Sequence, residues 1–92
     1  MQVKVVNGRV ELRRNNGILV GVVGYSNAMH AELHPTKNIL LIISETGKLE
    51  LRCFEGRLIK EILPSGVKDA KFKNDIIEIQ SVKGHILEHP LK

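Results

Sequence analysis

The sequence contains one stretch twice: residues 8–33 read GRVELRRNNGILVGVVGYSNAMHAEL, and residues 47–72 read GKLELRCFEGRLIKEILPSGVKDAKF. The two segments align at an offset of 39 residues without a gap, and eight of the 26 aligned pairs are identical. The identical pairs are Gly8/Gly47, Glu11/Glu50, Leu12/Leu51, Arg13/Arg52, Gly17/Gly56, Leu19/Leu58, Ser26/Ser65 and Ala31/Ala70. A repeat of this length is typical of stacked or radial repeat architectures.

Short alternating segments follow the glycine turns in both copies of the repeat. Val10 and Leu12 alternate with charged residues in 9–13, and the same alternation recurs in 48–53. A period of two predicts half-buried strands, and Asn7-Gly8 is a strong hairpin-turn signal. We therefore expect an all-β chain of about ten short antiparallel strands. Their ranges are 3–6, 9–14, 18–23, 28–33, 38–44, 47–53, 57–63, 67–72, 75–80 and 84–88.

Two segments make the strand prediction more specific. Residues 39–43 are apolar at every position, which predicts a strand that is covered on both faces. Residues 26–35, SNAMHAELHP, read locally as a short capped helix that ends at a proline. Because the aligned segment 65–72 has no such pattern, we expect a strand over 28–33, with a short helix as the alternative.

Length and composition limit the domain organisation and the compartment. The chain has 92 residues, a formal net charge of +4 and one cysteine. We expect a single repeat domain over 1–92, with units of about 1–33, 34–72 and 73–92. One cysteine excludes an intrachain disulfide, and the first residues show no apolar signal segment. The longest apolar run, Ile39–Ile43, is too short to span a bilayer, so we expect a cytoplasmic protein without membrane contact.

The segment 31–59 carries the order of elements found in a propeller blade. Ala31 and Ala70 provide a small residue for an innermost strand, a His34-Pro35 turn follows, and the next strand ends in Ser44. Glycine turns then separate two further strands. In this order the segment resembles the WD-repeat-like β-propeller families, although the Trp-Asp dipeptide of those families is missing. The resemblance implies about two and a half four-stranded blades.

An incomplete set of blades has consequences for assembly. A closed propeller typically needs about four or more blades, so this chain leaves sheet edges unpaired. We expect a homo-oligomer, a dimer, that completes a propeller-like or closed β-assembly; a compact barrel or sandwich of the same strands is the alternative. The predicted function is a protein-interaction or assembly module whose partner is itself or another protein.

Candidate metal and catalytic residues are few. His30 and His34 lie four residues apart, a spacing that on a helix could bind one zinc ion. On a strand the two side chains lie roughly 13 Å apart, which is too far for one ion. The same argument applies to His85 and His89. Cys53 is expected to be a buried structural thiol, and no phosphate-binding loop is present. We therefore predict no enzyme activity, no metal and no cofactor.

Four basic residues recur on one face of two equivalent strands: Arg9, Arg13, Lys48 and Arg52. Cations in such a row could contact phosphates. However, Glu11 and Glu50 share the same face, and no aromatic residues are placed to stack on bases. We therefore expect a solvated face of cross-strand Arg/Glu pairs. A nucleic-acid-binding module that uses these basic strand faces is the alternative function.

Overall fold

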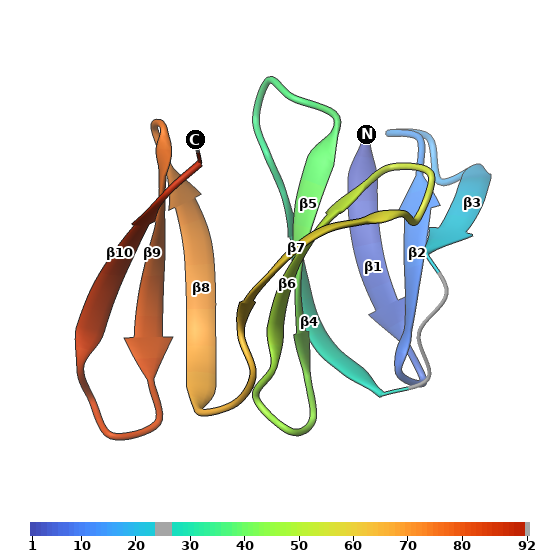
Figure 1. Ribbon diagram of the computed structural model, residues 1–92. Coiled ribbons are helices and arrows are strands. Elements are labelled where there is room, and N and C mark those ends of the chain that lie inside the picture. The colour runs from blue at the N-terminus through green and yellow to red at the C-terminus, as the bar shows by residue number, and fades with distance from the viewer. Residues whose placement is uncertain (24–26, 92) are drawn as a thin grey trace.

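The computed structural model describes residues 1–23 and 27–91, and within these ranges it contains ten β-strands and no helix (Figure 1). The strands form three antiparallel sheets. The first sheet contains β1 (Gln2–Val6), β2 (Arg9–Arg13) and β3 (Leu19–Val23). The middle sheet contains β4 (Ala28–Leu33), β5 (Ile39–Ser44), β6 (Leu49–Cys53) and β7 (Leu58–Leu63). The third sheet contains β8 (Val67–Lys73), β9 (Ile76–Ser81) and β10 (Ile86–Pro90). The predicted all-β fold is confirmed, and the ten predicted strands are present with bounds that differ by at most two residues from the prediction.

The three sheets follow one another along the chain and are arranged side by side in Figure 1. Within each sheet, neighbouring strands are consecutive in sequence. β1 lies against β4, and β8 lies against β4 and β5, so the sheet edges that face one another are β1, β4 and β8, and we call them the inner edges. The opposite edges are β3, β7 and β10, which we call the outer-edge strands.

The sequence repeat is also a structural repeat. The Ala28 N–H donates to the Gly8 carbonyl at 2.8 Å, and the Val67 N–H donates to the Gly47 carbonyl at 3.1 Å. Each bond joins a hairpin turn of one sheet to the first strand of the next sheet. The two bonds are related by the same offset of 39 residues that relates the sequences.

The segment with a local helix pattern is a strand. β4 covers 28–33 and pairs with β5, with Ala31 opposite Ile42. Ala70 lies opposite Ile79 in the same way, so the two alanines occupy equivalent positions. The strand predicted from the repeat is confirmed, and the helix alternative is wrong for these residues because pairing with β5 overrides the local propensity. Ser26, which belonged to that alternative, lies outside the described residues.

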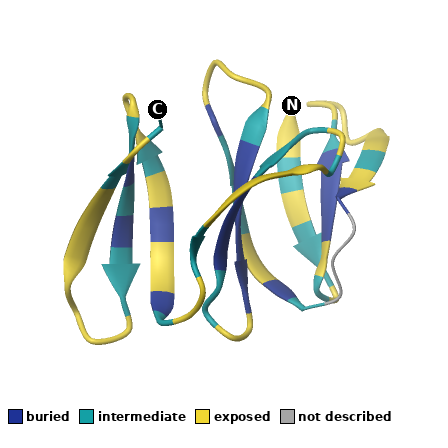
Figure 2. Cartoon of the chain, in the orientation of Figure 1, coloured by how far each residue is buried: buried dark blue, intermediate teal, exposed yellow. Residues whose placement is uncertain are grey.

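β5 is buried on both faces, as its uniformly apolar sequence predicts (Figure 2). Leu40 and Ile42 face the first sheet, whereas Leu41 and Ile43 face the third. The core between the first and middle sheets contains Val10, Leu12, Val23, Ala28, Leu40 and Ile42. The core between the middle and third sheets contains Leu41, Ile43, Leu49, Leu51, Val67, Ala70, Ile77 and Ile79. Burial of each large aliphatic side chain contributes roughly 1.5–3 kcal/mol, so β5 contributes to both cores.

Two turns depend on positive φ angles. Asn7 and Gly8 have φ values of 52° and 79°, which fit the two-residue hairpin turn predicted there. Gly47 has a φ of 82°, and a Cβ added to it would lie 2.8 Å from the Gly66 nitrogen. Glycine at 47 therefore permits the close approach between the middle and third sheets.

The first sheet has a polar outward face. Lys4 pairs with Glu11, and Ile42 pairs with Glu50, the glutamate aligned with Glu11. Lys4 therefore occupies the position that Ile42, which is fully buried, holds in the middle sheet. A sheet stacked on this face would have to desolvate the lysine, which is unfavourable without a partner.

The third sheet is polar at the other end of the stack. Because Ala31/Ile42 and Ala70/Ile79 are equivalent pairs, Glu78 occupies the position of the buried Leu41. Lys71 and Lys73 form ion pairs with Glu78 at 3.5 and 3.6 Å. Polar outer faces are typical of the terminal units of repeat proteins.

Candidate interaction surface

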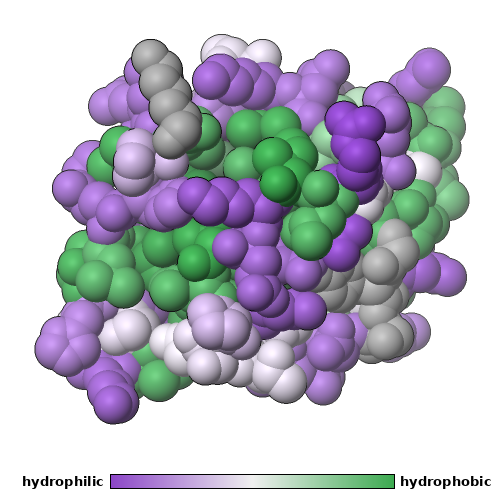
Figure 3. Space-filling model, in the orientation of Figure 1, coloured by the Kyte–Doolittle hydropathy of each residue, from purple (hydrophilic) through white to green (hydrophobic). Residues whose placement is uncertain are grey.

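Most of the exposed large hydrophobic side chains lie on the outer-edge strands, although Met29 on β4 and Val82 after β9 are also exposed. Those on the outer-edge strands are Leu19, Val20 and Val22 on β3, Leu58 and Ile59 on β7, and Ile86 and Leu87 on β10, and each is between 44% and 60% exposed. In Figure 3 hydrophobic atoms gather at the margin that β3 occupies in Figure 1. Contiguous exposed apolar side chains on a sheet edge are typical of interaction sites.

The first predicted basic cluster is centred on a carboxylate. Glu11 is 4% exposed and forms ion pairs with Arg9 at 3.1 Å and Arg13 at 2.7 Å. Arg13 Nη1 also donates to the Gly17 carbonyl at 2.8 Å and so closes the following turn. The hydrogen bonds from Arg13 hold the pKa of Glu11 below its ordinary value, and burial opposes this shift.

The second cluster repeats this arrangement in the middle sheet. Glu50 forms ion pairs with Lys48 at 3.4 Å and Arg52 at 3.1 Å. Arg52 Nη1 donates to the Gly56 carbonyl at 2.5 Å. The structure thus divides the four predicted basic residues between two clusters, and each cluster contains a buried carboxylate.

The ion pairs of Glu11 and Glu50 run along single strands, where residues two apart share a face, and not across strands as the sequence analysis expected. The strand neighbours of Glu50 are Ile42 on β5 and Glu61 on β7, so β6 itself supplies its cations. The carboxylates offset much of the positive charge that phosphate binding requires.

The two histidines considered as metal ligands differ in environment. His30 lies on β4 with its side chain half exposed, and its Nε2 is 3.7 Å from an Asp69 carboxylate oxygen. His34 is buried directly after β4. Among the residues that the structure describes, no group of three His, Cys, Asp or Glu side chains could hold a metal ion.

His34 organises the turn between β4 and β5. Its Nδ1 accepts hydrogen bonds from the backbone N–H groups of Thr36 at 3.1 Å and Lys37 at 3.0 Å. Its ring packs edge-on against Phe72 with the ring centroids 4.8 Å apart, and its Nε2 has no hydrogen-bond partner. The histidine of the His-Pro turn therefore has a structural role that the sequence analysis missed, although its position before Pro35 was a signal for a turn.

The remaining titratable side chains do not gather into one site. Cys53 is half buried, less deeply than the sequence analysis expected. His89 Nε2 lies 3.2 Å from Lys60 Nζ, and burial, together with the lysine charge, lowers the pKa of His89. Burial raises the pKa of Glu32, whose Oε2 has no hydrogen-bond partner. His85 is joined to Ser81 by two hydrogen bonds of its backbone: its N–H donates to Ser81 Oγ at 3.1 Å, and its carbonyl accepts from the Ser81 N–H at 2.9 Å.

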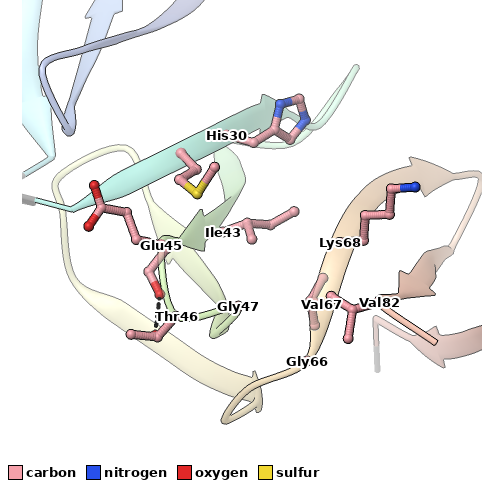
Figure 4. Close-up of a pocket in the computed structure, with 11 residues that line it drawn as sticks. His30, Ile43, Glu45, Thr46, Gly47, Gly66, Val67, Lys68 and Val82 are labelled. Atoms are coloured by element: carbon pink, nitrogen blue, oxygen red, sulfur yellow. Dashed lines mark hydrogen bonds between the residues drawn. The ribbon is translucent and has the colours of Figure 1, made fainter.

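A groove of about 430 Å³ lies at one end of the middle and third sheets (Figure 4). His30, Lys68 and Val82 are among its lining residues, and Val82 is largely exposed. The hydroxyl oxygens of Ser44 and Thr46 lie 2.8 Å apart and satisfy each other. Among the described residues, no buried polar side-chain atom that lacks a hydrogen-bond partner lines this groove, so it has few features of a specific ligand site.

Comparison with known proteins gives no family assignment, because neither a protein-family model nor a curated protein matches the chain. Within residues 1–23 and 27–91 the structure also contains no helix long and apolar enough to cross a membrane. The outer-edge strands are therefore the candidate interaction surface on structural grounds alone.

Proposed function

We propose that this chain is a non-catalytic protein-interaction or assembly module that acts in the cytoplasm. The observation that carries the proposal is the exposure of aliphatic side chains on the outer-edge strands, combined with polar faces at both ends of the stack. The polar faces disfavour further stacking, whereas the edges still offer unpaired backbone groups. Association through sheet edges is the mode that these features support.

The resemblance to propeller blades is part of the same proposal. The sheets succeed one another along the chain, their inner edges meet, and equivalent hydrogen bonds join each sheet to the next. These features support a propeller-like arrangement that self-association extends. The half-buried free cysteine supports a reducing compartment.

The test is the mass in solution, measured by light scattering over a range of concentrations, together with retention on immobilised nucleic acid at low and high salt. The proposal predicts a mass that rises above 10.3 kDa and no salt-sensitive retention. A mass of 10.3 kDa throughout, with retention that falls steeply as salt is added, would contradict it and favour the nucleic-acid alternative.

A further inference from the structure

β3 differs from β7 in having no charged residue. The repeat aligns 18–23, ILVGVV, with 57–62, RLIKEI. Ile18, Gly21 and Val22 thus replace Arg57, Lys60 and Glu61. Charged side chains on an edge strand hinder its pairing with another strand, so β7 is protected in a way that β3 is not.

The third outer-edge strand is also protected. β10 contains Glu88 and ends at Pro90, which cannot donate a backbone hydrogen bond. Among the described outer-edge strands, only β3 lacks both charge and proline. The edge most open to strand addition therefore belongs to the first sheet.

The side chains of β3 leave its edge accessible. Val20 is 50% exposed, Val22 is nearly as exposed, and a Cβ placed on Gly21 would meet no atom within 4 Å. β2 occupies one side of β3, and within residues 1–23 and 27–91 no strand pairs with its other side. An accessible apolar edge of this kind accepts an extended strand by main-chain hydrogen bonding.

We propose that β3 pairs antiparallel with β3 of a second copy, so that two three-stranded first sheets become one continuous sheet. This inference rests on the proposed assembly function and specifies its surface. An antiparallel pair of identical strands is related by a two-fold axis, so one surface patch is sufficient for both copies. The pairing of β3 with β2 is irregular at Val20, because Leu12 lies opposite Gly21 whereas Arg13 lies opposite Leu19. A second copy that pairs in a register centred on Gly21 places its Val22 opposite this Val20, and such β-branched pairs stabilise sheets.

Charge favours a second copy as the occupant of this edge. The chain carries a formal net charge of +4, so two copies repel each other, and a contact that is free of cations adds no close-range repulsion to this. β3 contributes no charge to the contact, and on the adjacent β2 Arg9 and Arg13 are both paired with Glu11. β3 thus allows two basic chains to meet without placing unpaired cations against each other.

The small size of the contact predicts its strength. Pairing of one five-residue strand with its copy falls below the roughly 1,600 Å² of a standard protein interface. We therefore expect a reversible dimer with a dissociation constant in roughly the micromolar to millimolar range. Further copies should not stack on the dimer, because the outward faces of the terminal sheets are polar.

The test compares Val20→Lys with Ile59→Lys by sedimentation velocity. These residues are aligned in the repeat and are 50% and 47% exposed, so each variant adds the same charge at an equivalent position. We expect the wild-type mass to rise from 10.3 kDa towards twice that value between about 1 µM and 1 mM. Val20→Lys should weaken association by at least about tenfold, whereas Ile59→Lys should match the wild type. Circular dichroism should show that both variants keep the fold.

A second variant keeps the test decisive if the Val20→Lys protein does not fold. Gly21→Lys with Val22→Glu transfers the residues of β7 to β3 and should also give a monomer. A wild-type dimer that persists in the β3 variants, or that Ile59→Lys weakens equally, would overturn the β3 contact and leave the assembly function standing. A wild-type mass of 10.3 kDa throughout would overturn self-association altogether. If that monomer bound an extended apolar peptide along β3, another protein would be the occupant of the edge.

Discussion

The middle sheet and the two terminal sheets share one strand pattern but differ in how their faces are used. β5 packs Leu40 and Ile42 against the first sheet and Leu41 and Ile43 against the third. The buried apolar side chains of the terminal sheets lie on the faces that meet the middle sheet, whereas their outward faces carry charged residues such as Lys4 and Glu78. The difference shows that a few positions within a repeat decide whether a sheet lies inside a stack or ends it.

The largest expected effect comes from exchanging residues between equivalent positions of these sheets. Ile42→Lys places in the middle sheet the residue that the first sheet has at position 4. Ile42 is fully buried, and Glu50, the carboxylate opposite it, is already paired with Lys48 and Arg52. The variant therefore buries a third cation beside one carboxylate, at a cost of about 3–5 kcal/mol. Because small domains are stable by only about 5–15 kcal/mol, urea denaturation should show a severely destabilised or unfolded protein.

The reciprocal variant, Lys4→Ile, is the matched control. Lys4 is exposed, so its replacement should change the free energy of unfolding by less than about 1 kcal/mol. It should also create an apolar outward face and promote association of the first sheet. Equal destabilisation by Ile42→Lys and Lys4→Ile would show that the two sheets do not differ as described.

A smaller effect is expected at the junction between the middle and third sheets. Gly47→Ala strains a residue with positive φ and also forces its Cβ against the Gly66 backbone, whereas Gly84→Ala strains a similar φ in open space. Gly84→Ala should cost about 1–2 kcal/mol, and Gly47→Ala should cost at least about 1 kcal/mol more. Thermal unfolding of both variants measures the difference. Equal Tm values for the two variants would show that contact between a Cβ at position 47 and the Gly66 backbone has no effect on stability.

The smallest effects concern two glutamates whose pKa values shift in opposite directions. The pKa of Glu11 is lowered in the folded state, so its stabilising contribution is present above its unfolded pKa and is lost as pH falls through the folded pKa. The pKa of Glu32 is raised, so its contribution is present below its unfolded pKa and is lost as pH rises through the folded pKa.

Glutamine variants remove these two titrations one at a time. Glu11→Gln should lower the Tm at neutral pH and reduce the loss of stability in acid. Glu32→Gln should leave the neutral-pH Tm unchanged or raise it, because it removes a buried charge without a full set of partners. Tm measured from about pH 3 to 8 tests both. Parallel pH profiles for the two variants would contradict the opposite environments of these carboxylates.

The sequence was sufficient to predict the strands because the repeat supplied evidence that local propensity could not. At 28–33 the aligned segment favoured a strand over the local helix pattern, and cross-strand pairing confirms it. The polar end faces were harder to predict. Lys4 aligns with Ile42 at an offset of 38 and not 39, because the turn before Lys48 is one residue longer than the turn before Arg9.

Two features of the candidate sites depend on geometry that the sequence does not contain. Glu50 pairs with cations of its own strand because its neighbours on the adjacent strands are Ile42 and Glu61, which carry no positive charge. The sequence alone does not show which residues are these neighbours. The role of His34 depends on a turn that brings two backbone N–H groups to its Nδ1. The alignment shows that β3 lacks the charged residues of β7. This difference bears on association only because both strands are sheet edges, which the structure shows.

Native-state amide hydrogen exchange tests most directly the claim that the middle sheet holds the stack together. Burial on both faces predicts that the amides of β5 and β6 exchange slowest, at the rate of global unfolding, while those of the terminal sheets exchange through smaller openings. The measurement is made at low concentration, where the chain is monomeric. Amides of β2 or β9 that outlast those of β5 would contradict the claim.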